Sequence, residues 1–183
     1  TNYNGYDISC TGYSDGGLDL TVSGSVPSYT YLWNTSDLTE DLSNLLTGTY
    51  SVDVVDTNGC FTNDSIFLAE PTPLISNYTV SDINGYNVCT GGTDGTIDIN
   101  IIGSVPSYIC EWDNGIQSQG LYNLSAGLYF YTITDQNGCV TSDSVLIAEP
   151  ILNISDSVNH VSCSGGIDGS VFVTASGDAS PYY

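Results

Sequence analysis

The sequence predicts an all-β protein made of tandem β-sandwich repeats, arranged like beads on a string, with one disulfide in each repeat. Three observations predict this fold class. A block of 79 residues recurs along the chain, short alternating apolar and polar runs are separated by turn residues, and cysteines return at a fixed spacing.

The internal repeat divides the chain. Gly24-Ser25-Val26-Pro27-Ser28-Tyr29 recurs letter for letter from Gly103 to Tyr108, and 103 − 24 = 79. A third copy follows, because the segment after Cys89 returns after Cys163, where 163 − 89 = 74. We therefore expect repeat 1 at residues 1–71 with its first strand incomplete, a complete repeat 2 at 72–150, and the first part of repeat 3 at 151–183. Such a pattern is typical of a longer array, so we expect the natural chain to continue on both sides.

Local patterns within repeat 2 indicate about seven strands and no helical period. The Asn58-Gly59 and Asn137-Gly138 pairs sit between alternating runs and predict type I′ hairpins, in which both residues have positive φ. Leu45-x-x-Gly48-x-Tyr50, with its copy ending at Tyr129, is typical of the tyrosine corner of Greek-key sandwiches. The predicted topology is therefore immunoglobulin-like.

Two tryptophans mark the expected core. Trp33 and Trp112 lie on a middle strand, with Tyr31 or Cys110 two residues earlier, so one face of that strand is large and apolar. We interpret both tryptophans as core residues rather than as a ligand platform.

Charge excludes several partners. The chain has no Lys or Arg, 21 acidic residues and a formal net charge of −21, so nucleic acid and anionic lipid surfaces are repelled. No apolar run approaches the roughly 18 residues of a membrane span, so we expect no membrane insertion in this segment. With the lone His160 and no recurring nucleophile and base, the chain is not expected to be an enzyme.

The cysteines predict an oxidising, extracellular location. Cys10 and Cys60 have the same separation as Cys89 and Cys139, since 60 − 10 = 50 and 139 − 89 = 50. This spacing predicts the disulfides Cys10–Cys60 and Cys89–Cys139. Cys163 is expected to pair outside these residues. Cys110 has no counterpart in repeat 1 and is expected to be a buried free thiol.

The ordered motifs resemble a known family. Cys-x-Gly-Gly-x-Asp-Gly, Gly-x-x-Pro-x-Tyr-x-x-x-Trp, Leu-x-x-Gly-x-Tyr, Asp-x-Asn-Gly-Cys and a closing Glu-Pro are similar to the SprB repeat of giant Bacteroidota surface adhesins. Repeat 1 departs from the pattern at Tyr13, which replaces one Gly. The resemblance implies export by the type IX secretion system, a bacterial cell-surface location and a role in gliding or adhesion.

Two sets of residues are candidate sites. Asp15, Asp94 and Asp168 occupy equivalent x-Asp-Gly turns, and Asp56 and Asp135 sit in the Asn-Gly hairpins. These residues either form the turns or bind calcium, which is the candidate cofactor of this chain. Asp-Ser followed by an aliphatic residue resembles a Bacteroidota O-glycosylation motif, with candidate acceptors Ser65, Ser144 and Ser157.

The predicted function is a structural and adhesive segment, an extended stalk of a long secreted surface adhesin or filament. Its expected partners are neighbouring repeats of the same chain and a surface polysaccharide or substratum. The alternative is a carbohydrate-binding module or the stalk of a secreted polysaccharide-degrading enzyme. A binding module presents exposed aromatic rings in a row, so burial of both tryptophans counts against it.

Overall fold

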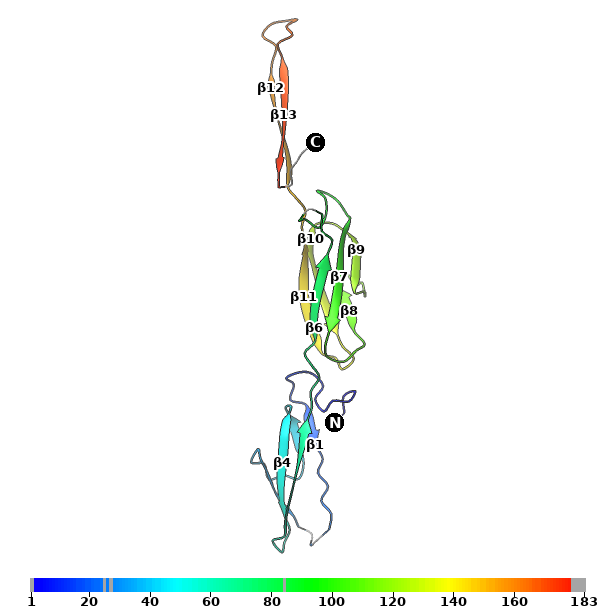
Figure 1. The fold of residues 1–183 in the computed structure, drawn as a ribbon, viewed down its shortest axis with the longest axis vertical. Coiled ribbons are helices and arrows are strands. Elements are labelled where there is room, and N and C mark those ends of the chain that lie inside the picture. Colours follow the sequence, from blue (N-terminus) through cyan, green and yellow to red (C-terminus); the bar gives the residue numbers. More distant parts are fainter. Residues whose placement is uncertain (1, 25, 27, 84, 179–183) are drawn as a thin grey trace. The chain divides into compact units, whose positions relative to one another are not determined.

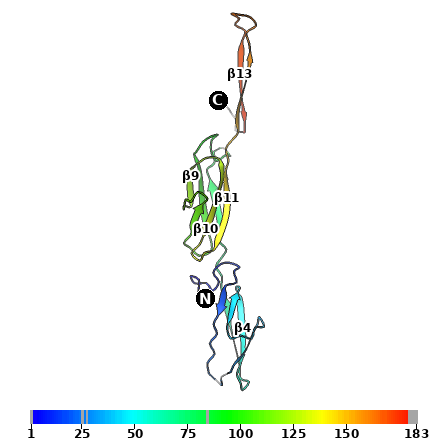
Figure 2. The same ribbon diagram turned by 180° about the vertical axis from the view of Figure 1, so that it is seen from behind.

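The structure is a computed structural model that describes residues 2–24, 26, 28–83 and 85–178. Every regular element in these residues is a β-strand, and the strands are visible from opposite sides in Figures 1 and 2. The all-β prediction is therefore confirmed. Pro181 to Tyr183, with which the third copy ends, lie outside the described residues.

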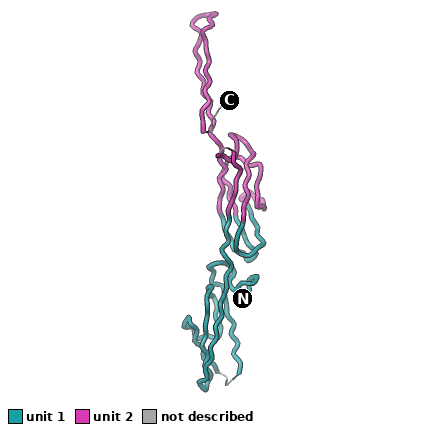
Figure 3. The backbone as a smooth tube through the Cα atoms, viewed as in Figure 1, with its two compact units in different colours: residues 1–76, 101–111, 132–142 teal, residues 77–100, 112–131, 143–183 magenta. Residues whose placement is uncertain are grey.

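Two compact units divide the chain (Figure 3). The first contains residues 1–76, 101–111 and 132–142, and the second contains 77–100, 112–131 and 143–183. The first unit thus combines all of repeat 1 with three segments of repeat 2, at residues 72–76, 101–111 and 132–142. The repeat boundaries at residues 71 and 150 stay a prediction based on sequence.

Repeat 1 contains two small sheets. Its strands are β1 (Gly16–Leu18), β2 (Thr30–Trp33), β3 (Leu42–Leu45), β4 (Gly48–Val55) and β5 (Phe61–Leu68). One sheet pairs β1 with β3, and the other has the order β2-β4-β5. All the pairings are antiparallel.

Repeat 2 repeats this plan and adds one strand before it. Its strands are β6 (Ile75–Val80), β7 (Gly95–Ile102), β8 (Ile109–Trp112), β9 (Gly120–Leu124), β10 (Gly127–Thr134) and β11 (Val140–Ile147). The sheet orders are β6-β7-β9 and β11-β10-β8, which are compatible with an immunoglobulin-like topology. Repeat 3 contributes an antiparallel hairpin of β12 (Leu152–Asn159) and β13 (Ser170–Gly177).

The core of repeat 1 draws on both of its sheets. Trp33, Val52 and Leu68 come from the β2-β4-β5 sheet, and Leu42 and Leu45 come from β3. Apolar residues alternate with polar ones along these strands, so one face of each sheet turns inward. Trp33 is 4% exposed and Trp112 is 1% exposed, which confirms that both tryptophans are core residues.

The tyrosine corner is present in both repeats. The Tyr50 hydroxyl donates to the carbonyl of Leu46, and the Tyr129 hydroxyl donates to the carbonyl of Ser125, each at 3.0 Å. The two corners have the same geometry, as the repeated motif predicts.

The Asn-Gly hairpins differ from the predicted turn type. Gly59 and Gly138 have positive φ, at 81° and 86°, whereas the preceding asparagines do not. The Gly59 N–H donates to the Asp56 carbonyl and the Asp56 N–H donates to the Cys60 carbonyl, both at 3.0 Å. This is a tight turn followed by a glycine bulge, so the type I′ prediction is wrong.

Candidate functional site: a junction between repeats

A disulfide joins Cys10 of repeat 1 to Cys139 of repeat 2. The two Cα atoms are 5.6 Å apart, and the bond closes 129 residues of sequence. Both side chains are buried, at 5% and 7% exposure. Every residue of this junction belongs to the first compact unit (Figure 3).

The predicted pairs Cys10–Cys60 and Cys89–Cys139 are wrong. Cys60 and Cys89 are unpaired and exposed. Cys60 stands before β5, whereas the N–H groups beside Cys10, at Asp7 and Ile8, bond to the Ala69 carbonyl after β5. Eight extended residues cover about 26 Å, and bonded cysteines need Cα atoms within about 7 Å. The strand therefore separates the two cysteines of one repeat.

The spacing alone could not reveal the correct partner. A separation of 50 residues recurs in each repeat, but 139 − 10 = 129 is that separation plus one repeat of 79. Both pairings join the cysteine near the start of a repeat to the cysteine of an Asn-Gly hairpin, because Cys60 and Cys139 are equivalent positions. The length of the strand between Cys60 and Ala69 is the signal that could have distinguished them.

The turn that carries Cys10 is hydrogen-bonded to the end of its own repeat. The Thr11 hydroxyl donates to the Pro71 carbonyl, and the Gly12 N–H donates to the Glu70 carboxylate, both at 2.7 Å. Gly12 has φ 77°, a conformation that favours glycine. The turn presents Cys10 beside the Glu-Pro linker.

The hairpin that carries Cys139 is organised by a buried carboxylate. One oxygen of Asp135 accepts hydrogen bonds from the N–H groups of Asn137 at 2.9 Å and Cys139 at 2.7 Å. The other oxygen accepts from the Ser104 hydroxyl at 2.5 Å and the Val105 N–H at 3.1 Å. Burial raises the pKa of Asp135, but these hydrogen bonds outweigh it and hold the pKa below its usual value.

Asn137 adds polar contacts around the disulfide. Its side-chain amide donates to the carbonyls of Ser9 at 3.0 Å and Tyr3 at 3.3 Å. Its side-chain oxygen accepts from the Asn4 amide at 2.5 Å. The sequence interpretation missed this role for Asn137, which was considered only as a turn residue. A covalent bond and several hydrogen bonds thus connect the two repeats.

The calcium candidates are engaged in turns. Asp56 repeats the pattern of Asp135, with the N–H groups of Asn58 and Cys60 bonding one oxygen at 2.9 and 2.7 Å. Asp15 accepts from the Ser9 N–H, and Asp168 accepts from the Ser162 N–H, both at 3.1 Å. Among the described residues, no three His, Cys, Asp or Glu side chains form a group that could hold a metal ion, Asp94 included. Calcium binding stays a prediction.

The pKa values of two turn carboxyls follow the same hydrogen bonds. For Asp15, slight burial raises the pKa. The hydrogen bonds from Ser9 lower the pKa and outweigh the effect of burial, so the net shift is downward. For Asp168, the hydrogen bonds from Ser162 lower the pKa. Both carboxylates serve turn formation.

The remaining two cysteines are unpaired, which confirms the prediction for Cys110, while the pairing of Cys163 outside these residues stays a prediction. Cys110 is a buried free thiol whose pKa is raised by burial, and Cys163 is unpaired and exposed. Of the candidate glycosylation sites, Ser65 and Ser157 are exposed and Ser144 is half-buried. Glycosylation itself stays a prediction.

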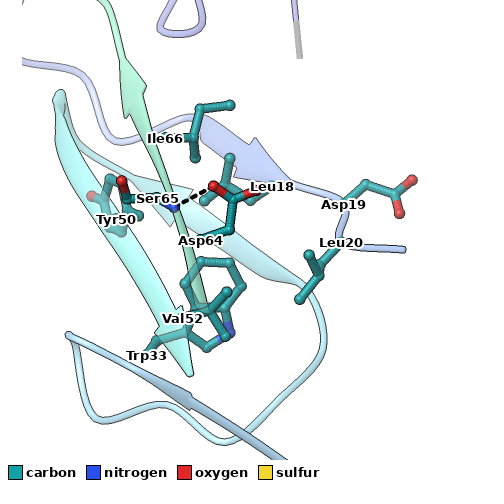
Figure 4. Close-up of a pocket in the computed structure, with 9 residues that line it drawn as sticks. All are labelled: Leu18, Asp19, Leu20, Trp33, Tyr50, Val52, Asp64, Ser65 and Ile66. Carbon is teal, nitrogen blue, oxygen red and sulfur yellow. Dashed lines mark hydrogen bonds between the residues drawn. The ribbon is translucent and has the colours of Figure 1, made fainter. Parts of the chain in front are cut away.

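A groove lies beside β1 in repeat 1 (Figure 4). Its lining residues are Leu18, Asp19, Leu20, Trp33, Tyr50, Val52, Asp64, Ser65 and Ile66. In repeat 2, β6 lies beside β7, the counterpart of β1. No described strand takes that place beside β1.

Comparison with known proteins gives one match to a family model. Residues 3–38 match the family model of the SprB repeat, the family that the motifs resemble. No curated protein matches the chain. Within the described part of the chain, no helix is long and apolar enough to span a membrane. The SprB repeat is a structural repeat of cell-surface proteins rather than an enzyme family. The match of residues 3–38 to the SprB repeat therefore suggests a repetitive, adhesin-like segment of a cell-surface protein.

Proposed function

We propose that this chain is a structural segment of a long secreted surface adhesin or filament, and that it acts as an extended stalk in surface attachment or gliding. The observation that carries this proposal is the Cys10–Cys139 disulfide, which ties consecutive repeats together. A bond inside one repeat stabilises only that repeat. A bond between repeats restrains the joint, which is the property that a stalk needs.

Surface charge supports the same function. The chain has 21 acidic residues and no Lys or Arg. Like charges repel along the chain, so the repeats resist collapsing onto one another and onto anionic lipid. Export by the type IX system and attachment to polysaccharide or to a substratum belong to this proposal.

The carbohydrate-binding alternative has weaker support. Trp33 and Trp112 are buried, so neither ring is available to stack on a sugar. A pull-down on insoluble polysaccharides compares the two functions. If the segment is a stalk, we expect the polysaccharide not to retain it. Saturable retention on the polysaccharide would favour the binding module.

The disulfide can be mapped with the protease Asp-N, which cleaves before aspartate. Each cysteine then falls on its own peptide, because aspartates flank all six cysteines. We expect peptide 7–14 to be joined to peptide 135–142 in unreduced native protein. Intact mass before and after reduction reports the same bond and any sugar on Ser65, Ser144 or Ser157.

Location is tested on the native cells. Antibodies against this chain are expected to label intact, unpermeabilised cells, and deletion of the protein is expected to reduce surface attachment or gliding. Labelling that appears only after permeabilisation would contradict the proposal.

A further inference from the structure

Asn137 is followed by glycine, and an Asn-Gly pair is chemically reactive. Glycine has no side chain, so its backbone nitrogen can approach the carbonyl carbon of the asparagine side chain with little hindrance. Attack there releases the side-chain nitrogen as ammonia and leads to aspartate or isoaspartate. Asn114-Gly115, in an exposed turn of repeat 2, is another pair of this kind and serves as a comparison.

The closed junction restrains both reacting groups of the Asn137 pair (Figure 3). The side-chain amide of Asn137 donates to the carbonyls of Ser9 at 3.0 Å and Tyr3 at 3.3 Å. The N–H of Gly138, which is the nucleophile, donates to the Asp135 carbonyl at 3.2 Å. The reaction requires the amide to leave both carbonyls of repeat 1 and turn toward Gly138.

The Asn114 pair is held only at the glycine in the same way. The Gly115 N–H donates to the Trp112 carbonyl at 2.8 Å, as Gly138 donates to Asp135. The Asn114 side-chain oxygen accepts from the Ile116 N–H at 3.0 Å, within the same turn. The two nucleophiles are therefore restrained alike, whereas the contacts of the Asn137 amide cross to the other side of the disulfide.

The disulfide that closes the junction is within reach of a small thiol. Cys10 and Cys139 are 5% and 7% exposed, but both line a pocket together with Tyr13, Pro73 and Ser104. A molecule of the size of glutathione or cysteine can therefore approach the sulfur atoms without unfolding of the repeat.

We propose that Asn137 is a deamidation site controlled by the Cys10–Cys139 disulfide. While the bond is closed, Asn137 stays an amide. After a small thiol reduces the bond, the side chain leaves the carbonyls of repeat 1, reacts with Gly138 and becomes a carboxylate that hinders re-closure. The proposed stalk function requires only the closed bond, so the two proposals stand or fall separately.

The steps balance with a small thiol and water as the only co-reactants. Two thiol molecules convert the disulfide into two cysteine thiols and become one small-molecule disulfide. The Gly138 nitrogen then bonds to the side-chain carbonyl carbon of Asn137, its proton passes to the leaving nitrogen, and ammonia departs from a cyclic imide. Water adds to one of the two imide carbonyls and opens the ring to aspartate or isoaspartate.

The product does not fit the closed junction. A carboxylate has no hydrogen to donate, so the carbonyls of Ser9 and Tyr3 would face an acceptor in place of a donor. It also adds a second negative charge to the hairpin of Asp135, whose lowered pKa keeps that carboxyl ionised at neutral pH. An isoaspartate lengthens the backbone between Asp135 and Cys139, whose hydrogen bond of 2.7 Å positions the cysteine.

The first test follows Asn137 and Asn114 in the full chain at neutral pH, with the bond closed or reduced. Asp-N cleaves before aspartate and not before isoaspartate. An aspartate at position 137 therefore gives peptide 137–142, and an isoaspartate leaves peptide 135–142 intact with a changed mass. We expect reduction to raise the conversion rate at Asn137 at least about tenfold and to leave that at Asn114 unchanged, because a reaction that needs local opening follows the open population.

Two variants separate the bond from the reductant. Cys10→Ser, without reductant, is expected to give the same rise at Asn137, and Cys163→Ser, which removes an exposed unpaired thiol, is expected to give none. Equal rates at Asn137 with the bond closed and open would overturn the inference. An equal rise at Asn114 would also overturn it, since the whole repeat would then have loosened.

The second test measures re-closure. Asn137→Asp carries the charge of the product, and in a glutathione redox buffer its 7–14 to 135–142 link is expected to have an equilibrium constant at least about tenfold lower than in the parent. Asn114→Asp adds the same charge in an exposed turn and is expected to link like the parent. An Asn137→Asp chain that links equally well would overturn the inference. Absence of the link in the parent would instead contradict the proposed function.

Discussion

Ile66 and Val145 occupy the same position in two copies of one repeat, since 145 − 66 = 79, yet Ile66 is half exposed and Val145 is fully buried. The sheet that contains β7 also contains β6, whereas the sheet that contains β1 has only β3. A single strand supplied by the linker thus distinguishes the two cores. The cysteines differ in parallel, because Cys10 is bonded and its equivalent Cys89 is not. Among the described residues, the core of repeat 1 thus lacks the strand that covers the core of repeat 2.

The largest expected loss of stability comes from leaving position 10 without a disulfide, as its equivalent Cys89 is. Cys10→Ser removes the bond that closes 129 residues, and the loop-entropy model predicts a loss of about 5 kcal/mol in the free energy of unfolding. Urea denaturation of the oxidised chain measures it. Cys163→Ser removes an exposed, unpaired thiol and is the control. Equal midpoints for the two variants would contradict a stabilising junction.

Truncating the two equivalent aliphatic residues tests the comparison itself. Val145→Ala removes buried methyl groups and is expected to cost about 2 kcal/mol, while Ile66→Ala, at a half-exposed site, is expected to cost less than about 1 kcal/mol. Thermal or urea unfolding of both variants measures the difference. Similar costs would mean that the groove beside β1 is filled in solution.

Asp135 is expected to give a smaller effect that depends on pH. Asp135→Asn weakens four hydrogen bonds to a carboxylate and is expected to cost about 1.5 kcal/mol at neutral pH. The pKa of Asp135 is lowered in the folded chain. Its contribution is therefore full above the unfolded pKa of about 3.9 and is lost as pH falls through the folded pKa.

Unfolding measured from neutral pH down to strongly acidic pH tests this dependence. The cost of Asp135→Asn is expected to shrink as the parent carboxylate becomes protonated. Asp113→Asn, at an exposed position, is the control and is expected to change stability little at any pH. A cost of Asp135→Asn that is constant with pH would show that the charge of Asp135 is not what stabilises the hairpin.

The tyrosine corners are expected to give the smallest effect and no difference between repeats. Tyr50→Phe and Tyr129→Phe each remove one hydrogen bond of 3.0 Å and are expected to cost about 1 kcal/mol each. Urea unfolding of the two variants gives the comparison. Clearly unequal costs would mean that the missing strand weakens repeat 1 well beyond the groove.

Local patterns predicted much of the fold. The alternation of apolar residues indicated strands, the Leu-x-x-Gly-x-Tyr motif indicated the corner, and the position of Trp33 indicated burial, because each depends on residues a few positions apart. The hairpin type was less predictable. An Asn-Gly pair suits more than one turn, and the carboxylate of Asp56 or Asp135 favours the one observed.

The junction could not be predicted from local patterns. In a repeating sequence, a cysteine has equivalent partners one repeat away, so spacing leaves the choice between Cys60 and Cys139 open. The length of β5 determines the partner of Cys10, because this strand separates Cys60 from Cys10. The contacts of Asn137 depend on the same choice. Periodicity predicts the unit of an array better than the links between units.

The position of the disulfide also determines how the chain transmits force. Tension applied at the two ends reaches Cys10 and Cys139 and passes through the covalent bond, bypassing the chain between them, which has a sequence separation of 129. That segment has a contour length of about 440 Å when fully extended, none of which is released while the bond remains. Reduction would release it. Pulled in an oxidising medium, the chain should therefore act as a short, stiff tether, and in a reducing medium as a long, yielding one.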